Sequence, residues 1–311
     1  DSGTFTVTRA SDSKASNTSS AFYIYPQITS ISAASFSDGG YQDGTFTLNG
    51  NHFGSGGLAS NISVNGVAPS SIGVWSATSV TGVDISNTGT DSGVITLTSP
   101  GTSKVSNNSD TFYIYPQIAS YTASQTDGDI QTGTITITGN HFGTGGGNSN
   151  IAINGVAPSA TIPTWGAGSI TNVDIPNAGT DSGVIVVTNP ATTKPSNNST
   201  AFYIYPQITG TVDVPTGTPD AAREYSASDS DGVFAILGNH FGAAGTVTIL
   251  GGSATQQTTT TCAGTAYQTT CVGLRVPDVA GYTGSIIITR TADTKTNTYA
   301  GFRVLPRIIS T

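Results

Sequence analysis

The stretch Phe22-Tyr-Ile-Tyr-Pro-Gln-Ile28 decides the fold, because it returns almost unchanged along the chain. It recurs from Phe112 and again from Phe202, 90 residues apart each time, and a weaker copy begins at Phe302. Repeats of about 20–50 residues are typical of solenoids and propellers. A period of 90 residues is too long for those architectures and fits one small β-sandwich per repeat.

Other short elements keep the same period. Gly-Asn-His-Phe-Gly begins at Gly50, Gly139 and Gly238, and Asp-Ser-Gly begins at Asp1, Asp91 and Asp181, while a single lysine marks each repeat. Within a repeat, short alternating runs such as 45–48 and 93–98 are separated by turn signals, which predicts six or seven strands. The sequence therefore predicts an all-β chain of tandem immunoglobulin-like β-sandwiches arranged as a rod.

The repeats are out of phase with the numbering. Residues 1–25 hold only the last hairpin of an incomplete domain, and 26–115, 116–205 and 206–311 form repeats 1, 2 and 3, of which the third is longer. A lone two-stranded hairpin is marginally stable in water. We therefore expect strands from outside residues 1–25 to complete the first domain, either from a longer chain or from a neighbouring subunit.

Composition excludes several function classes. Charged residues make up 9% of the 311 residues, the net charge is −8 and the pI is about 4.5, so no basic surface is available to neutralise nucleic-acid phosphates. No apolar run approaches the length of about 18 residues that a membrane span needs. No nucleophile, base and orienting group are arranged around any histidine, and no enzyme activity is expected.

The order of the motifs resembles a known family. A strand, the Gly-x-x-Phe-Gly element from Gly50 to Gly54, a strand ending in Asn-Gly-Val-Ala, Trp75, Val-Asp and then Gly-Val-Ile-Thr-Leu-Thr look like the IPT/TIG type of immunoglobulin-like domain. The resemblance implies an early-set sandwich, and in a tandem, acidic, Thr-rich chain it implies a bacterial or archaeal surface protein. The third repeat departs from the pattern, with Tyr267 about where Trp75 and Trp165 fall.

The joint between repeats is short, because only a proline and a glutamine separate the last strand of one repeat from the isoleucine that opens the next. Alternation on that last strand predicts that phenylalanine and isoleucine face the core and that the two tyrosines face the following domain. The other interpretation is that these tyrosines are simply solvent-exposed. The predicted interdomain junction comprises Tyr23, Tyr25, Pro26, Tyr113, Tyr115, Pro116, Tyr203, Tyr205 and Pro206.

Two further sites depend on residue type and spacing. Cys262 and Cys271 are predicted to form one local disulfide in an oxidising compartment; the alternative is two free thiols. Closely spaced aspartates among glycines supply the oxygen ligands that calcium prefers, although such residues also dominate ordinary turns. Calcium is thus the one cofactor left open, and its candidate ligands are Asp127, Asp129, Asp229 and Asp231.

Repeated polar and aromatic residues have a structural interpretation beside a functional one. His52, His141 and His240 occupy one repeat position a domain length apart, so a structural role in the turn before each phenylalanine is expected. The two tryptophans are expected in the core, with sugar stacking as the alternative. Asn-x-Ser/Thr triplets leave glycosylation open at Asn17, Asn61, Asn107, Asn197 and Asn198.

These observations favour a structural protein of the extracellular space or cell surface, a building block of a filament, stalk or surface layer. One alternative is an adhesin or carbohydrate-binding surface protein, and another is an accessory segment of a large secreted enzyme. The expected partners are copies of the chain itself or other surface proteins, with glycans as ligands under the first alternative, and neither nucleic acid nor a membrane span.

Overall fold

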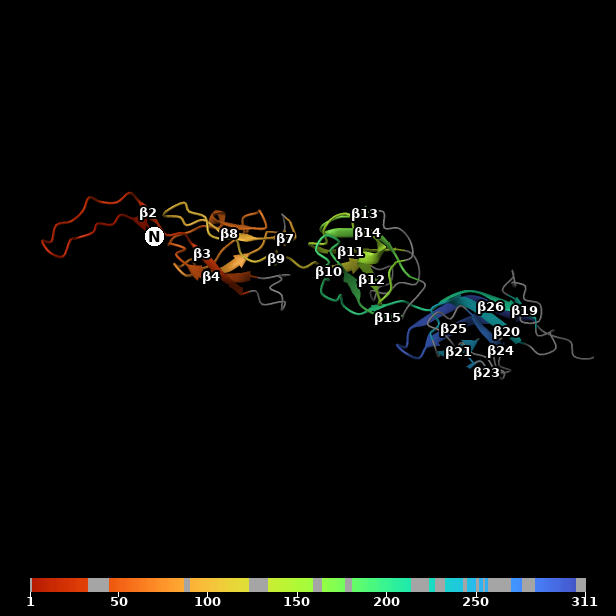
Figure 1. Cartoon of the computed structure of the whole chain (residues 1–311). Helices are drawn as coiled ribbons and strands as arrows, with labels where there is room; N and C mark the ends of the chain where they lie inside the picture. The colour runs from red at the N-terminus through yellow and green to blue at the C-terminus, as the bar shows by residue number, and fades with distance from the viewer. Residues whose placement is uncertain are drawn as a thin grey trace, which may run out of the picture.

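The computed structural model shows an extended chain of compact β units (Figure 1). The N-terminal hairpin and three units follow one another end to end, and unit 1, unit 2 and unit 3 below are these in chain order. Among the described residues, the only helical elements are two single turns, η1 (Ala59–Asn61) and η2 (Asn148–Asn150). The structure describes residues 2–32, 45–86, 90–122, 134–158, 164–176, 181–213, 224–226, 233–242, 245–249, 252–253, 255–256, 270–275 and 283–305.

Unit 1 is built from one three-stranded antiparallel sheet and two antiparallel strand pairs that together form the opposite layer. The sheet has the order β3-β4-β6, with β3 at Gln27–Ser32, β4 at Thr45–Asn51 and β6 at Ser79–Asp84. The opposite layer pairs β5 (Ile62–Val64) with β8 (Ile95–Leu97), and β8 continues from β7 (Ser92–Gly93), which pairs with β9 (Phe112–Tyr113). Two antiparallel layers face to face make the expected immunoglobulin-like sandwich.

Unit 2 repeats this topology with the same register. Its first sheet has the order β10-β11-β14-β13, and its second part pairs β12 with β16 and β15 with β17. The bounds are β10 Gln117–Thr122, β11 Thr134–Asn140, β12 Ile151–Ile153, β13 Thr164–Trp165, β14 Ser169–Asp174, β15 Ser182–Gly183, β16 Ile185–Val187 and β17 Phe202–Tyr203.

Unit 3 has longer strands. One sheet has the order β18-β20-β24-β23 and the other the order β19-β26-β25-β21-β22, in which β19 and β26 are parallel. The bounds are β18 Gln207–Asp213, β19 Glu224–Ser226, β20 Val233–Asn239, β21 Gly245–Ile249, β22 Gly252–Ser253, β23 Thr255–Gln256, β24 Thr270–Arg275, β25 Thr283–Arg290 and β26 Thr296–Leu305. The predicted all-β array of immunoglobulin-like sandwiches is thus confirmed.

Each unit has a separate hydrophobic core, because alternate residues of its strands point inward. The cores lie within residues 28–114, 118–204 and 208–302, and none of them shares a residue with another. Phe112 and Ile114 are buried in the core of unit 1, and Phe202 and Ile204 in that of unit 2, as the alternation predicts.

The Gly-Asn-His-Phe-Gly element brings two strands unusually close. A methyl group on Gly139 would overlap the Gln117 carbonyl oxygen and meet the Phe142 ring, and the same holds at Gly50 and Gly238. Only a residue without Cβ lets the second strand of a unit pass between the first strand and the buried ring. The close approach therefore fixes the position of the strand end from which the histidine of this element projects.

The N-terminal hairpin is the exception to this packing. β1 (Ser2–Gly3) pairs with β2 (Phe22–Tyr23), and the hairpin repeats the last two strands of units 1 and 2. Its apolar residues Phe5, Val7 and Phe22 are 59%, 64% and 57% exposed, whereas their counterparts in units 1 and 2 are at most 2% exposed. No other described strands cover this face.

Candidate functional site

Successive units meet through one recurring set of side chains. We call the end of a unit that faces its successor the exit end, and the turn between the last two strands of a unit the tip. At each described junction the tip of one unit contacts the exit end of the preceding unit, and at the two junctions between complete units the histidine turn contacts it as well. The tips are residues 8–14 in the hairpin and 98–104, 188–194 and 289–295 in units 1 to 3.

Between units 1 and 2, the Asp91 carboxylate accepts two hydrogen bonds from unit 2. His141 Nδ1 donates to Oδ1 at 2.9 Å, and Asn189 Nδ2 donates to Oδ2 at 2.7 Å. Because a carboxylate only accepts, the His141 proton lies on Nδ1. The His141 side chain is 7% exposed and that of Asp91 14%, so water competes little for these bonds. Hydrogen bonds to a charged group are stronger than those between neutral groups, so these two bonds stabilise the contact between units 1 and 2.

The backbone conformation of the histidine directs its side chain toward the preceding unit. His141 has a φ of 58° and His240 one of 58°, the left-handed region that a non-glycine residue rarely adopts. The His141 carbonyl accepts a second bond from Asn189 Nδ2 at 3.0 Å, which stabilises this turn. The structural role predicted for the histidines is extended here, because the ring contacts the preceding unit rather than its own turn.

Between units 2 and 3, Asp181 replaces Asp91 and Arg290 replaces Asn189. His240 Nδ1 donates to Asp181 Oδ1 at 2.7 Å, and Arg290 NH1 lies 3.2 Å from Asp181 Oδ2. Arg290 NH1 also donates to the His240 carbonyl at 2.7 Å, as Asn189 does to His141. The geometry of the junction is thus kept although the donor changes from an amide to a guanidinium.

The Arg290 guanidinium is buried and hydrogen-bonded. Its side chain is 1% exposed, and the side chain of Asp293 is 7% exposed. Besides the contacts above, Arg290 donates to the Ile204 carbonyl at 2.6 Å and through Nε and NH2 to both Asp293 oxygens at 2.9 and 2.6 Å. Four hydrogen bonds and the ion pair with Asp181 therefore compensate the buried guanidinium, as a buried charge requires.

A lysine clamp lies beside each carboxylate contact. The ammonium nitrogen of the lysine that closes each tip lies 4.4 Å from the ring centroid of one tyrosine of the preceding exit end and 4.9–5.6 Å from a second. Such cation–π contacts contribute about 0.5–2 kcal/mol each, depending on burial. The pairs are Lys104 with Tyr23 and Tyr25, Lys194 with Tyr113 and Tyr115, and Lys295 with Tyr203 and Tyr205.

The prolines of the predicted junction are buried at all three joints, at Pro26, Pro116 and Pro206. The tyrosines differ in exposure: Tyr23 and Tyr25 are exposed and Tyr115 is buried. The ring centroid of each of the six tyrosines lies 4.4–5.6 Å from the ammonium nitrogen of the lysine in the following tip.

The predicted disulfide and calcium sites lie outside what the structure describes. Cys262 is outside the described residues, and Cys271 lies in β24 with an undescribed side chain, so their pairing stays a prediction. The candidate calcium ligands Asp127, Asp129, Asp229 and Asp231 are also outside the described residues. Within the described part of the chain, no three His, Cys, Asp or Glu side chains are grouped for a metal ion.

The tryptophans pack on the cores, as expected. Trp75 lies against the core of unit 1 and donates from Nε1 to the Gly54 carbonyl at 3.2 Å, and Trp165 donates to the Phe142 carbonyl at 3.3 Å. Each indole stacks where a glycine leaves room, Gly57 for Trp75 and Gly146 for Trp165.

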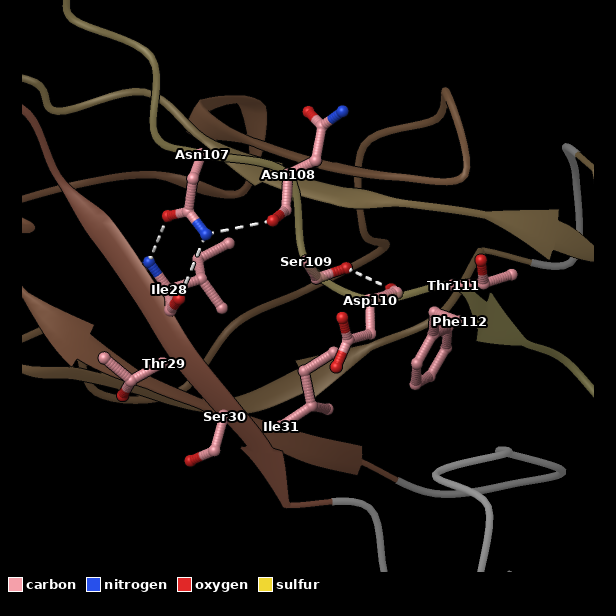
Figure 2. A pocket seen from close by; sticks show the side chains of 10 residues that line it. All are labelled: Ile28, Thr29, Ser30, Ile31, Asn107, Asn108, Ser109, Asp110, Thr111 and Phe112. Carbon is pink, nitrogen blue, oxygen red and sulfur yellow. Dashed lines mark hydrogen bonds between the residues drawn. The ribbon is translucent and has the colours of Figure 1, made fainter.

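An asparagine takes the place of strand pairing between the first and last strands of a unit. Figure 2 shows Asn107 beside β3, where its side chain accepts a bond from Ile28 N at 2.8 Å and donates to Ile28 O at 3.2 Å. Next to these hydrogen bonds, residues 28–31 and 107–112 line a groove of about 380 Å³. In unit 2, the Asn197 side chain forms the same two hydrogen bonds with the backbone of Ile118. The amide nitrogens of two candidate glycosylation sites, Asn107 and Asn197, therefore donate hydrogen bonds to backbone carbonyls of the same unit.

The aspartate–histidine contact was missed in the sequence, although a signal was present. Asp-Ser-Gly and Gly-Asn-His-Phe-Gly both repeat once per unit, but periodicity does not reveal that they meet across a boundary. The same is true of the lysine, whose period matches that of the tyrosines it covers.

No protein-family model matches the chain, and no curated protein matches it. Solved structures similar to it include the surface glycan-binding protein PbSGBP-B from Prevotella bryantii, 11% identical over 60% of this chain, with a TM-score of 0.30. The I9-I11 tandem from titin is 12% identical over 91% of this chain and 98% of its own, with a TM-score of 0.20. SGBP-B of Bacteroides ovatus, in complex with a mixed-linkage heptasaccharide, is 13% identical over 91% of this chain and 69% of its own, with a TM-score of 0.22.

The chain spans 42% of the length of PbSGBP-B. At such identities and TM-scores these likenesses carry no functional argument. Among the described residues, no helix is long and apolar enough to cross a membrane.

Proposed function

We propose that this chain is a structural extracellular protein, a building block of a stalk, filament or surface layer made of immunoglobulin-like units stacked at fixed orientation. The observation that carries the proposal is the repeated junction. An aspartate–histidine contact recurs at the two junctions between complete units, and a lysine clamp recurs at three.

The length of the joint supports the same conclusion. β9 ends at Tyr113 and β10 begins at Gln117, and the intervening Ile114, Tyr115 and Pro116 are all buried. Domain orientation is variable by default when the linker is exposed and the interface small. A buried joint combined with charge-assisted contacts removes that freedom, as a stiff rod requires.

The N-terminal hairpin supports assembly. Its exposed apolar row, Phe5, Val7, Phe22 and Ile24, has buried counterparts in units 1 and 2. Strands from a neighbouring subunit or a longer chain would complete a fourth sandwich over this row. The proposed partners are accordingly copies of the chain or other surface proteins.

We expect Asp91→Ala to loosen the joint between units 1 and 2, because His141 and Asn189 both lose their acceptor. In small-angle scattering the maximum dimension should become less sharply defined, while the junction at Asp181 keeps units 2 and 3 in line. Asp110→Ala, which removes a carboxylate on the last strand segment of the same unit, is the matched control and should leave the curve unchanged. An Asp91→Ala curve that superimposes on the wild-type curve would count against the proposal.

A further inference from the structure

The tips of this chain come in two chemical forms. Units 1 and 2 have Thr-Ser-Pro-Gly-Thr-Ser-Lys at 98–104 and Thr-Asn-Pro-Ala-Thr-Thr-Lys at 188–194. The N-terminal hairpin has Thr-Arg-Ala-Ser-Asp-Ser-Lys at 8–14, and unit 3 has Thr-Arg-Thr-Ala-Asp-Thr-Lys at 289–295. The hairpin therefore shares the arginine, aspartate and lysine of the tip that docks unit 3 onto unit 2.

The two arginine tips also have the same geometry. Arg9 donates to Asp12 from Nε at 2.8 Å and from NH2 at 2.6 Å, as Arg290 does to Asp293 at 2.9 and 2.6 Å. Ser13, with a φ of 55°, occupies the left-handed position that Thr294 occupies with a φ of 60°. The Arg9 guanidinium also holds the pKa of the Asp12 carboxyl below its usual range.

The tips differ in what surrounds them. The Arg290 side chain is 1% exposed because it is docked against Asp181 and the Ile204 carbonyl of the preceding unit. The Arg9 side chain is 66% exposed, and its only hydrogen bonds among the described residues go to Asp12. The hairpin tip therefore has the docked conformation without a docking partner, so little ordering cost remains to be met on binding.

We propose that the tip at residues 8–14 is a docking site for the exit end of a separate immunoglobulin-like unit of the unit 2 kind. Arg9 would bind a carboxylate at the place of Asp181 and a backbone carbonyl at the place of Ile204. Lys14 would lie over a Tyr-x-Tyr pair at the place of Tyr203 and Tyr205.

The exit ends within this chain do not supply that partner. The exit ends of the hairpin, unit 1 and unit 2 are each covered by the tip that follows them. In unit 3, Tyr282 stands at the sequence position of Asp181, and Arg303 and Leu305 stand at those of Tyr203 and Tyr205. A carboxylate and both rings are thus replaced, and Arg303 would repel Arg9 and Lys14. The partner is therefore a unit that the three described here do not provide, and simple head-to-tail stacking of this chain through unit 3 is disfavoured.

The test uses the full chain together with a probe in which the exit end of unit 2 is uncovered. Residues 26–206 serve as the probe, because they contain the complete cores of units 1 and 2, which lie within 28–204. Binding is measured by sedimentation velocity and isothermal titration, with the probe alone as the control for its own association. We expect a one-to-one complex with a dissociation constant below about 1 mM.

A double-mutant cycle identifies the contact. Arg9→Ala in the full chain and Asp181→Ala in the probe should each weaken binding at least about tenfold, and the two together should weaken it no further. Both side chains are outside the cores, so the variants should melt like their parents.

Two results would overturn the proposal: no complex up to about 1 mM, or an unchanged affinity with Arg9→Ala. In the second case, a loss of binding with Phe22→Ser would assign binding to the apolar face of the hairpin. The inference rests on the proposed function only because it treats docking of the hairpin tip as one more junction between units. The stiffness of the rod is measured on the full chain alone, so failure of the docking test would not contradict the rod, and a flexible rod would not contradict the docking.

Discussion

Replacing Arg290 with alanine is expected to weaken the docking of unit 3 on unit 2 by about 3–5 kcal/mol and so to detach the two units, because the docked state would keep an unpaired carboxylate buried. The substitution leaves the Asp293 carboxylate buried without its cation, and it removes donors from the carbonyls of His240 and Ile204. An uncompensated buried charge costs far more than the net stabilisation that an ion pair gives. Hydrogen exchange followed by mass spectrometry on unit 3 peptides measures the loss, while peptides of unit 1 serve as an internal reference.

The hairpin provides the matched control for this prediction. Arg9→Ala removes the same guanidinium from the same turn, but at an exposed site, so it should change exchange in the chain very little.

Repairing the tip should restore the junction. Arg290→Asn combined with Asp293→Thr gives unit 3 the residues that unit 2 has at Asn189 and Thr192. The new asparagine can then donate to Asp181 and to the His240 carbonyl, as Asn189 does to Asp91 and His141. A double variant as unstable as Arg290→Ala would contradict this account of the junction.

Phe142→Ala is expected to destabilise unit 2 by about 3–5 kcal/mol, because it leaves a ring-sized cavity in a fully buried position. Phe142 is 0% exposed and lies against the glycine that lets β10 and β11 approach, so the site cannot collapse without moving strands. The loss is followed by hydrogen exchange in unit 2 peptides.

Phe5→Ala removes the same ring from a site that is 59% exposed, and it should leave stability nearly unchanged. Equal losses for the two variants would mean that Phe5 is covered in solution. That outcome would contradict the description of the hairpin as an uncovered half-sandwich.

Much of the fold could be predicted from the sequence, because it depends on patterns that repeat. Alternation in 45–48 and 134–138 predicts strands with one buried face, and the structure places Phe46, Leu48, Ile135 and Ile137 inside. The close approach at Gly139 was not predicted, since it depends on how near two backbones pass.

The junction could be predicted only in part. The short joint and the alternating tyrosines can be read from the sequence. The residues that meet across the joint cannot, because Asp91 is 50 residues from His141 and Lys194 is far along the chain from Tyr113. Arg290 was missed because an arginine in a polar turn looks solvent-exposed until a neighbouring unit covers it. The predicted cysteine and calcium sites lie outside the described residues and stay predictions.

Residual dipolar couplings of backbone amides in the full chain test the central claim most directly, because they report the relative orientation of the units in solution. A fixed junction predicts that the couplings of units 1, 2 and 3 fit one alignment tensor, with one magnitude and with axes that agree with the arrangement in Figure 1. Separate tensors for the units, with different magnitudes, would mean that the units move independently. That result would contradict the account of this chain as a stiff rod held by its aspartate–histidine and lysine–tyrosine contacts.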